Sequence, residues 1–167
     1  MDDSLTARGS DGEPSSEDKT SAWAVFLTAH AVLVGRIEER LRAAGMPDLG
    51  WYDVLWALER APGQRLRMSE LAELTVISRS NLTRLVDRLQ ARGLVERDRD
   101  CADRRGAYAV LTRAGRAQRR AMWKVYGQAV EDLFDGHFSS SEMATMRGLL
   151  MRVLNAARAG RGDDHPS

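Results

Sequence analysis

The sequence predicts a mainly α protein that combines a winged helix-turn-helix with a helical dimerisation region. Two features of residues 68–111 predict the winged unit: two short helical patterns are joined by a tight turn, and a charged β-hairpin follows them. A third feature, apolar stripes at helical spacing in the long stretches on either side, predicts the dimerisation region. A chain of 167 residues is long enough to build one domain with a hydrophobic core.

The first helix of the unit is expected to begin near Ser69, whose hydroxyl can accept a free backbone N–H of the first turn. The pattern stops at residues 75–77, a β-branched run that is poorly suited to a helix. Ser78 is then expected to cap the second helix, and Gly93 stands where a C-terminal glycine belongs.

The second helix is predicted to be a recognition helix, the element that enters the major groove of DNA. One side is an apolar stripe at helical spacing, and the other carries side chains that hydrogen-bond base edges and phosphates. An ordinary solvated face explains this second side, taken alone, about equally well. The stripe is Leu82, Leu85, Val86 and Leu89, and the candidate DNA-binding residues are Arg79, Ser80, Asn81, Thr83, Arg84 and Arg88.

The hairpin favours DNA binding over a merely solvated helix. Residues 94–97 alternate as a short strand, residues 108–111 form its return, and residues 65–67 are a candidate third strand. The connection between them interleaves aspartate with arginine, and an extended arginine tip suits the negative potential of a narrow minor groove. Asp103, Arg104 and Arg105 are its candidate DNA-binding residues.

Charge is concentrated in the middle of the chain, although the net charge is only +1. Residues 65–120 hold fourteen arginines and seven acidic side chains, whereas residues 1–20 hold six acidic and two basic ones. A basic middle within a nearly neutral chain is the electrostatic footprint of a nucleic-acid site.

The flanks of the winged unit divide the chain further. We expect a disordered acidic tail at 1–19, a dimerisation helix at 20–47, the winged helix-turn-helix at 48–111, C-terminal dimerisation helices at 112–158 and a flexible tail at 159–167. Thr112 is the expected cap of the helix after the wing, and Ser139 with Glu142 forms a capping box. The three apolar stripes exceed what one subunit can bury, so a homodimer is expected.

The sequence resembles the MarR family of transcriptional regulators over roughly residues 21–157. The most specific matches are Asp103 and Arg105, which fit the family's D-x-R wing motif, and Leu111-Thr112-x-x-Gly115, which reopens a helix after the wing. This resemblance implies a homodimeric winged-helix regulator, in the commoner case a repressor. It also implies binding to palindromic operators in double-stranded DNA, and release by a small ligand or an oxidant.

The resemblance also suggests where a small aromatic or purine effector would bind. In the family, the first two helices and the helix after the wing surround the effector pocket. In the subgroup that responds to urate, a tryptophan and an aspartate on the first two helices help to bind the ligand, and Trp23 and Asp53 resemble that pair. Trp56 would add to the aromatic wall. We favour the competing interpretation, which places both tryptophans in the core and makes Asp53 a surface or capping charge.

Other classes of function find less support in the sequence. It shows no catalytic triad, phosphate-cradling glycine loop or Cys/His cluster, so we expect no enzyme, cofactor or metal site. No apolar run approaches ~20 residues and no signal peptide opens the chain, which predicts a cytoplasmic protein without membrane segments. A winged protein-interaction module would have a neutral recognition helix, and Arg79, Arg84 and Arg88 argue against it.

Two single residues allow sharper alternatives. Cys101, the only cysteine, could make the chain an oxidant-responsive regulator. We favour a tolerated surface residue, because no second thiol is available to form a reversible disulfide. His30 lies on the apolar stripe of the first helix, and we expect a partly buried, hydrogen-bonded histidine there and no metal ligand.

Overall fold

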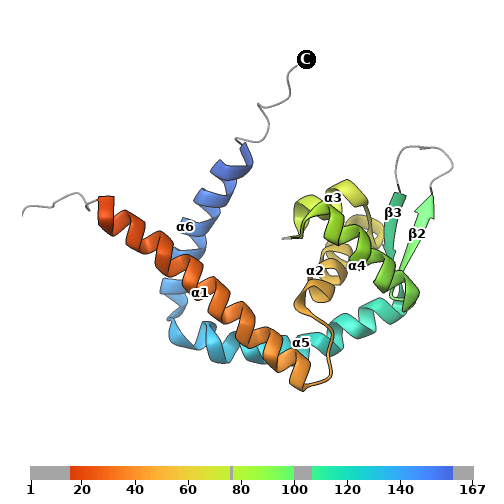
Figure 1. Cartoon of the computed structure of the whole chain (residues 1–167), viewed down its shortest axis with the longest axis horizontal. Coiled ribbons are helices and arrows are strands. Elements are labelled where there is room, and N and C mark those ends of the chain that lie inside the picture. Colours follow the sequence, from red (N-terminus) through yellow and green to blue (C-terminus); the bar gives the residue numbers. More distant parts are fainter. Residues whose placement is uncertain (1–15, 76, 100–106, 160–167) are drawn as a thin grey trace, which may run out of the picture. The chain divides into compact units, whose positions relative to one another are not determined.

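The computed structural model describes residues 16–75, 77–99 and 107–159, whose helices and strands are traced in Figure 1. Residues 1–35 and 36–167 form two compact units. The helix α1 (Ser16–Ala43) runs through the boundary between them.

The described part of the first unit is the N-terminal portion of α1. The helix begins at Ser16, so residues 16–19 are helical, which corrects the predicted disordered tail; residues 1–15 lie outside the described residues. Trp23 stacks on Phe26 with ring centroids 5.9 Å apart. His30 is exposed, so the prediction of a partly buried histidine is wrong. Trp23 and Phe26, which belong to the predicted apolar stripe of this helix, are 59% and 45% exposed.

The second unit contains the winged helix-turn-helix. Its helices are α2 (Leu49–Arg60), α3 (Met68–Leu74) and α4 (Arg79–Ala91), and a 3-10 turn at Pro62–Gln64 follows α2. Gly93 has a φ of +67°, which ends α4 in the left-handed conformation that glycine adopts without strain. Ser78 stands at the N-cap of α4 as predicted, but its side chain makes no capping hydrogen bond.

The start of α3 differs from the prediction. Arg67, and not Ser69, is the N-cap residue, and Ser69 lies within the first turn. The backbone N–H of Arg67 donates to the carboxylate of Glu70 at 2.9 Å. The Glu70 side chain therefore accepts a hydrogen bond from the backbone at the N-terminal end of α3.

The wing is a three-stranded antiparallel sheet. The strands β1 (Arg65–Arg67), β2 (Val95–Arg99) and β3 (Ala107–Leu111) lie in the order β1–β3–β2, which confirms the predicted third strand. Arg65 pairs with Val110, and Val95 pairs with Leu111. The predicted wing tip, including Cys101, lies outside the described residues.

The hydrophobic core lies between α2, α3, α4, the sheet and the following helix α5 (Arg113–Leu133), with Ile37 and Leu41 of α1 joining it. Thr112 caps α5 as predicted: its Oγ1 accepts from the Gly115 N–H at 3.0 Å and donates to the Gly93 carbonyl at 2.8 Å. The largest fully buried side chains are Leu41, Val54, Leu55, Leu58, Leu71, Leu82, Val86, Leu89, Val95 and Met122.

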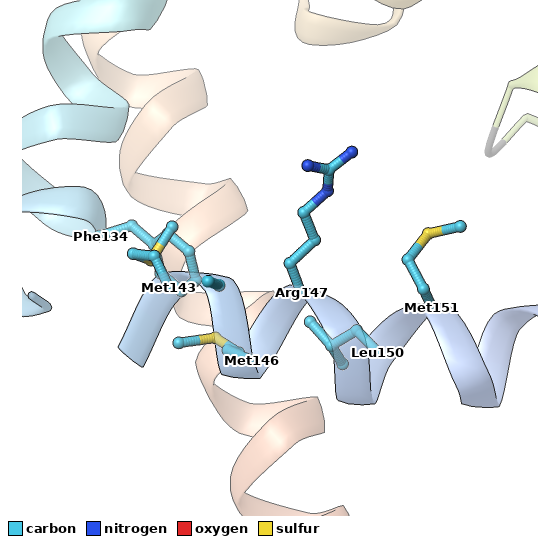
Figure 2. A pocket seen from close by; sticks show the side chains of 7 residues that line it. Phe134, Met143, Met146, Arg147, Leu150 and Met151 are labelled. Atoms are coloured by element: carbon cyan, nitrogen blue, oxygen red, sulfur yellow. The ribbon is translucent and has the colours of Figure 1, made fainter. Parts of the chain in front are cut away.

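The C-terminal helix α6 (Ser140–Ala159) has no buried residue, although it follows α5 after a single 3-10 turn at Asp135–His137. The predicted capping box starts it, since the Ser139 N–H donates to Glu142 at 2.8 Å. A mostly apolar hollow of about 450 Å³ lies along α6, and Figure 2 shows Phe134, Met143, Met146 and Leu150 at its lining. This face is therefore open to a further protein surface.

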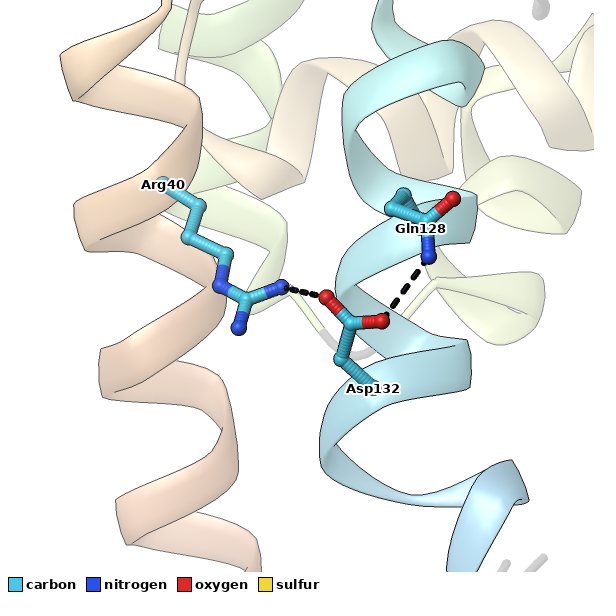
Figure 3. Close-up of polar contacts among 3 residues, drawn as sticks. All are labelled: Arg40, Gln128 and Asp132. Atoms are coloured by element: carbon cyan, nitrogen blue, oxygen red, sulfur yellow. Dashed lines mark hydrogen bonds and ion pairs between the residues drawn. The ribbon is translucent and has the colours of Figure 1, made fainter.

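A polar contact ties the end of α1 to α5. Arg40 Nη1 lies 2.6 Å from Asp132 Oδ2, and Gln128 donates to the other carboxylate oxygen at 2.8 Å (Figure 3). The hydrogen bonds from Gln128 and then from Arg40 lower the pKa of the Asp132 carboxyl. Because Arg40 and Asp132 are both partly exposed, the pair contributes little to the stability of the fold and serves mainly to orient the end of α1 against α5.

Candidate nucleic-acid interface and ligand pocket

The helix α4 separates a buried face from a polar one, as the sequence predicted. Leu82, Leu85, Val86 and Leu89 are at most 4% exposed. The opposite face leaves five of the candidate DNA-binding side chains in solvent: Ser80, Asn81, Thr83, Arg84 and Arg88. The side chain of the sixth, Arg79, lies outside the described residues. The hydrogen-bonding groups on this exposed face suit base edges and phosphates.

The wing strand β2 is fastened to α4 by an ion pair that the sequence analysis missed. Arg97 Nη2 lies 2.6 Å from Asp87 Oδ1, and the two side chains are 29% and 57% exposed. The signal was the alternation of β2: Arg97 shares the side of buried Val95, so it points toward the helices. The pair joins the wing strand β2 to the candidate recognition helix.

Tyr108 gathers both arginines of β1 at the base of the wing. The guanidinium of Arg65 lies 4.1 Å from the centre of its ring, and Arg67 Nε donates to its hydroxyl at 2.9 Å. Arg65 also lies 3.7 Å from Asp98 on β2. These contacts link all three strands at the base of the wing. Asp103, Arg104 and Arg105 themselves lie outside the described residues.

A separate pocket of about 560 Å³ lies between α2 and α5. It brings together two predicted effector residues, Asp53 and Trp56, with four side chains that the sequence analysis did not select: Tyr52, Arg119, Trp123 and Tyr126. Helical spacing placed Tyr52 and Trp56 on one side of α2, but the partners from α5 required the packing of the two helices. Trp23 belongs to the first unit, so its part in ligand binding stays a prediction.

Aromatic rings form the wall of this pocket. Tyr52 stacks on Trp56 at 6.2 Å and on Trp123 at 5.9 Å, with interplanar angles of 19° and 22°. Tyr126 meets Tyr52 edge-on at 4.8 Å. Trp56 and Trp123 are 39% and 48% exposed, so neither tryptophan is a core residue of the subunit. The competing interpretation of Trp56 as core is therefore wrong.

The charged groups of the pocket differ in their partners. Arg119 forms an ion pair with Glu59, and both side chains are largely buried. Desolvation, together with the charge of Glu38, raises the pKa of Asp53 from 3.8 to about 6. No ion pair to Asp53 occurs within the described ranges. Among the described residues, Asp53 is thus a half-buried carboxylate with no cation paired to it.

No helix in the described part of the chain is both long and apolar enough to cross a membrane. Across the same ranges, no group of three or more His, Cys, Asp or Glu side chains is placed to hold a metal ion.

A helix-turn-helix with an antiparallel wing and an exposed polar helix face defines a winged-helix regulator. The sequence profile of the MarR family matches residues 44–106. Over 112 residues the chain is 30% identical to the transcriptional regulator HosA of Escherichia coli, covering 66% of this chain and 81% of that protein. The chain belongs to the MarR family and is a DNA-binding transcriptional regulator of that family.

Solved structures agree with this assignment. AbsC, a MarR family regulator from Streptomyces coelicolor, superimposes with a TM-score of 0.77 at 26% identity and covers 89% of this chain and 99% of its own. Sco3205, a MarR family regulator from the same organism crystallised in complex with DNA, gives 0.75 at 29% identity, covering 89% and 92%. Family membership also indicates a regulatory and not an enzymatic role.

Proposed function

We propose that this chain is a homodimeric repressor that binds a palindromic operator in double-stranded DNA and leaves it when a small ligand binds. The observation that carries the proposal is the contrast between the two faces of α4. Its apolar stripe is buried, whereas Asn81, Arg84 and Arg88 remain in solvent beside the wing. Sco3205, which shares this fold at 29% identity, was crystallised with DNA.

Each part of the interface has a separate task in this proposal. Asn81 and Arg84 near the start of α4 contact base edges, which gives sequence preference. Arg105 of the wing enters the minor groove and Asp103 holds it in place, which gives affinity. The remaining candidates bind phosphates or neighbouring bases and fix the position of the helix: Arg79, Ser80, Thr83, Arg88 and Arg104.

Pairing with a second copy would cover the exposed apolar surface. The helix α6 leaves Leu149, Leu150, Val153 and Leu154 between 41% and 67% exposed, and the first unit exposes Trp23 and Phe26. We propose that residues 20–47 and 112–158 form the two-fold interface, with residues 48–111 as the DNA-binding region. A two-fold dimer would present two recognition helices about one DNA turn, ~34 Å, apart, and therefore read a palindrome.

The pocket between α2 and α5 is the proposed effector site, with Asp53 and Trp56 as ligand contacts and Trp23 as a further candidate. Its position suits control of DNA binding, because α2 packs on α3 and α4, and α5 is itself part of the proposed dimerisation region. A ligand that binds the DNA-free arrangement more tightly would shift the population away from the operator.

Selection of bound sites from random duplex DNA, followed by titrations at several salt concentrations, tests the DNA-binding part. Arg84→Ala should cost ~1–3 kcal/mol and relax preference at one position, whereas Arg105→Ala should weaken all sequences and lower the salt slope by about 1. The matched control is Arg152→Ala, which removes an exposed arginine of α6 and should change neither the sequence preference nor the salt slope of DNA binding. Unchanged binding by Arg105→Ala would show that the wing assignment is wrong. If the parent chain bound no duplex DNA, the protein-interaction alternative would replace the proposal.

A further inference from the structure

We infer that the pocket between α2 and α5 selects a flat aromatic cation, of the amidinium or protonated heteroaromatic kind, over an anion of the same shape. The inference rests on the proposed effector site and names the chemical class of its ligand. It follows from three features of the described residues: the balance of charge, the free aromatic faces and the groups that already occupy part of the wall.

Among the described residues, the charge left unpaired at the pocket is negative. Arg119 is the cation among the lining residues, and Glu59 already pairs with it. Asp53 is half-buried with no ion pair among the described residues, and Glu38 is close enough to raise its pKa further. An aromatic carboxylate would therefore enter beside an unneutralised carboxylate. A cation would instead offset the desolvation of Asp53.

The aromatic wall favours the same class of ligand. Trp123 is 48% exposed, and within the described ranges no cation lies over its ring. Its indole lines the pocket, stacks on Tyr52 and meets Tyr126 edge-on at 5.7 Å, and the face of such a ring carries negative potential. A cation placed over an indole face is attracted by the ring quadrupole, most strongly where water is partly excluded.

The protein's own side chains show that this wall accepts planar cations. The guanidinium of Arg119 lies 5.1 Å from the centre of the Trp56 ring, and that of Arg60, at the exposed rim, lies 5.5 Å from it. A ligand amidinium against Trp123 would repeat this arrangement with Asp53 as its acceptor. The volume of about 560 Å³ lies within the ~300–1,000 Å³ typical of small-molecule sites.

Three probes of nearly equal shape test the inference: benzamidinium, benzamide and benzoate. Isothermal titration calorimetry of the full chain at pH about 7.5 keeps Asp53 ionised. Benzamidinium should bind at least about tenfold more tightly than benzoate, with benzamide between them. Equal affinities, tighter binding of benzoate, or no binding of benzamidinium at millimolar concentration would overturn the inference.

Variants assign the selectivity to the pocket. Asp53→Asn should reduce benzamidinium affinity about tenfold and leave benzamide nearly unchanged. Trp123→Leu should weaken benzamidinium more than benzamide, because the cation loses the π face. Asp48→Asn removes an exposed acid at the start of α2 and should change nothing, since asparagine caps a helix as well as aspartate. Preserved selectivity in Asp53→Asn would also overturn the inference.

A parallel titration with a selected operator duplex separates this inference from the proposed function. If benzamidinium binds with the expected selectivity but does not weaken operator binding, the ligand class stands and the effector role fails. If no duplex is bound at all, the DNA-binding proposal fails, and the calorimetric series still decides the ligand class.

Discussion

The α6 helix offers the most quantitative test of the proposed dimer. Leu150 is 43% exposed in the single chain and is one of the residues that line the apolar hollow along α6 (Figure 2). Complete burial of a leucine stabilises by ~1.5–3 kcal/mol, so covering its exposed fraction should contribute about 1 kcal/mol per copy. Two-fold symmetry doubles the effect of Leu150→Ala to about 2 kcal/mol, which raises the dimer Kd about 30-fold.

Sedimentation equilibrium over a concentration series measures this change directly. Arg152→Ala, on the side of α6 away from the apolar stripe, should leave the Kd unaltered. Circular dichroism should report the same helix content for both variants, because Leu150 contributes nothing to the buried core of the subunit. A parent chain that stays monomeric at micromolar concentration, or a Leu150→Ala variant with the parent's Kd, would refute the reasoning.

Three further predictions concern single positions. Gly115→Ala should lower the free energy of unfolding by ~1–3 kcal/mol in urea titrations, because a Cβ there would clash with the Leu94 carbonyl and stand 2.7 Å from Leu111 Cδ1. Folding raises the pKa of Asp53 to about 6, so the folded protein binds more protons than the unfolded chain between pH 4 and 6. The free energy of unfolding of the parent should therefore fall as the pH rises through that window. The free energy of unfolding of Asp53→Asn should depend less on pH there. Cys101→Ser should bind operator as tightly as the parent, and peroxide should release neither; release of the parent alone would make the chain an oxidant sensor.

Local patterns in the sequence predicted most of the fold, because they depend on spacing along one element. The stripe from Leu82 to Leu89 is buried as its helical period requires, and Thr112 caps α5 through its own hydroxyl. The third strand was predicted as well, and residues 65–67 pair with residues 108–110 of β3. The earlier start of α1 at Ser16 was not predicted, because the polar composition of residues 16–19 matches that of a tail.

Contacts between distant segments account for what the sequence analysis did not find. Asp87 and Arg97 pair only after α4 and β2 have packed, and nothing in the intervening residues indicates their distance. The pocket shows the same limit: Asp53 and Trp56 were selectable from α2, whereas Trp123 reaches them only because α5 crosses beside α2. Tertiary packing therefore completes the candidate site from residues that are ordinary in their local context.

The position of α2 suggests how a ligand could act on DNA binding. Asp53 and Trp56 face the pocket, whereas Gly50, three residues before Asp53, lies close enough to α4 that a Cβ added to it would stand 3.5 Å from Leu85 Cδ2. Leu85 is only 4% exposed, so close packing leaves little room for α2 to move without α4. A ligand that displaces α2 relative to α5 should therefore turn the recognition helix, and the Asp87–Arg97 pair would carry the wing with it. The smaller side chain of Leu85→Ala should loosen this link, so that a bound ligand releases less DNA while its own affinity for the pocket is retained.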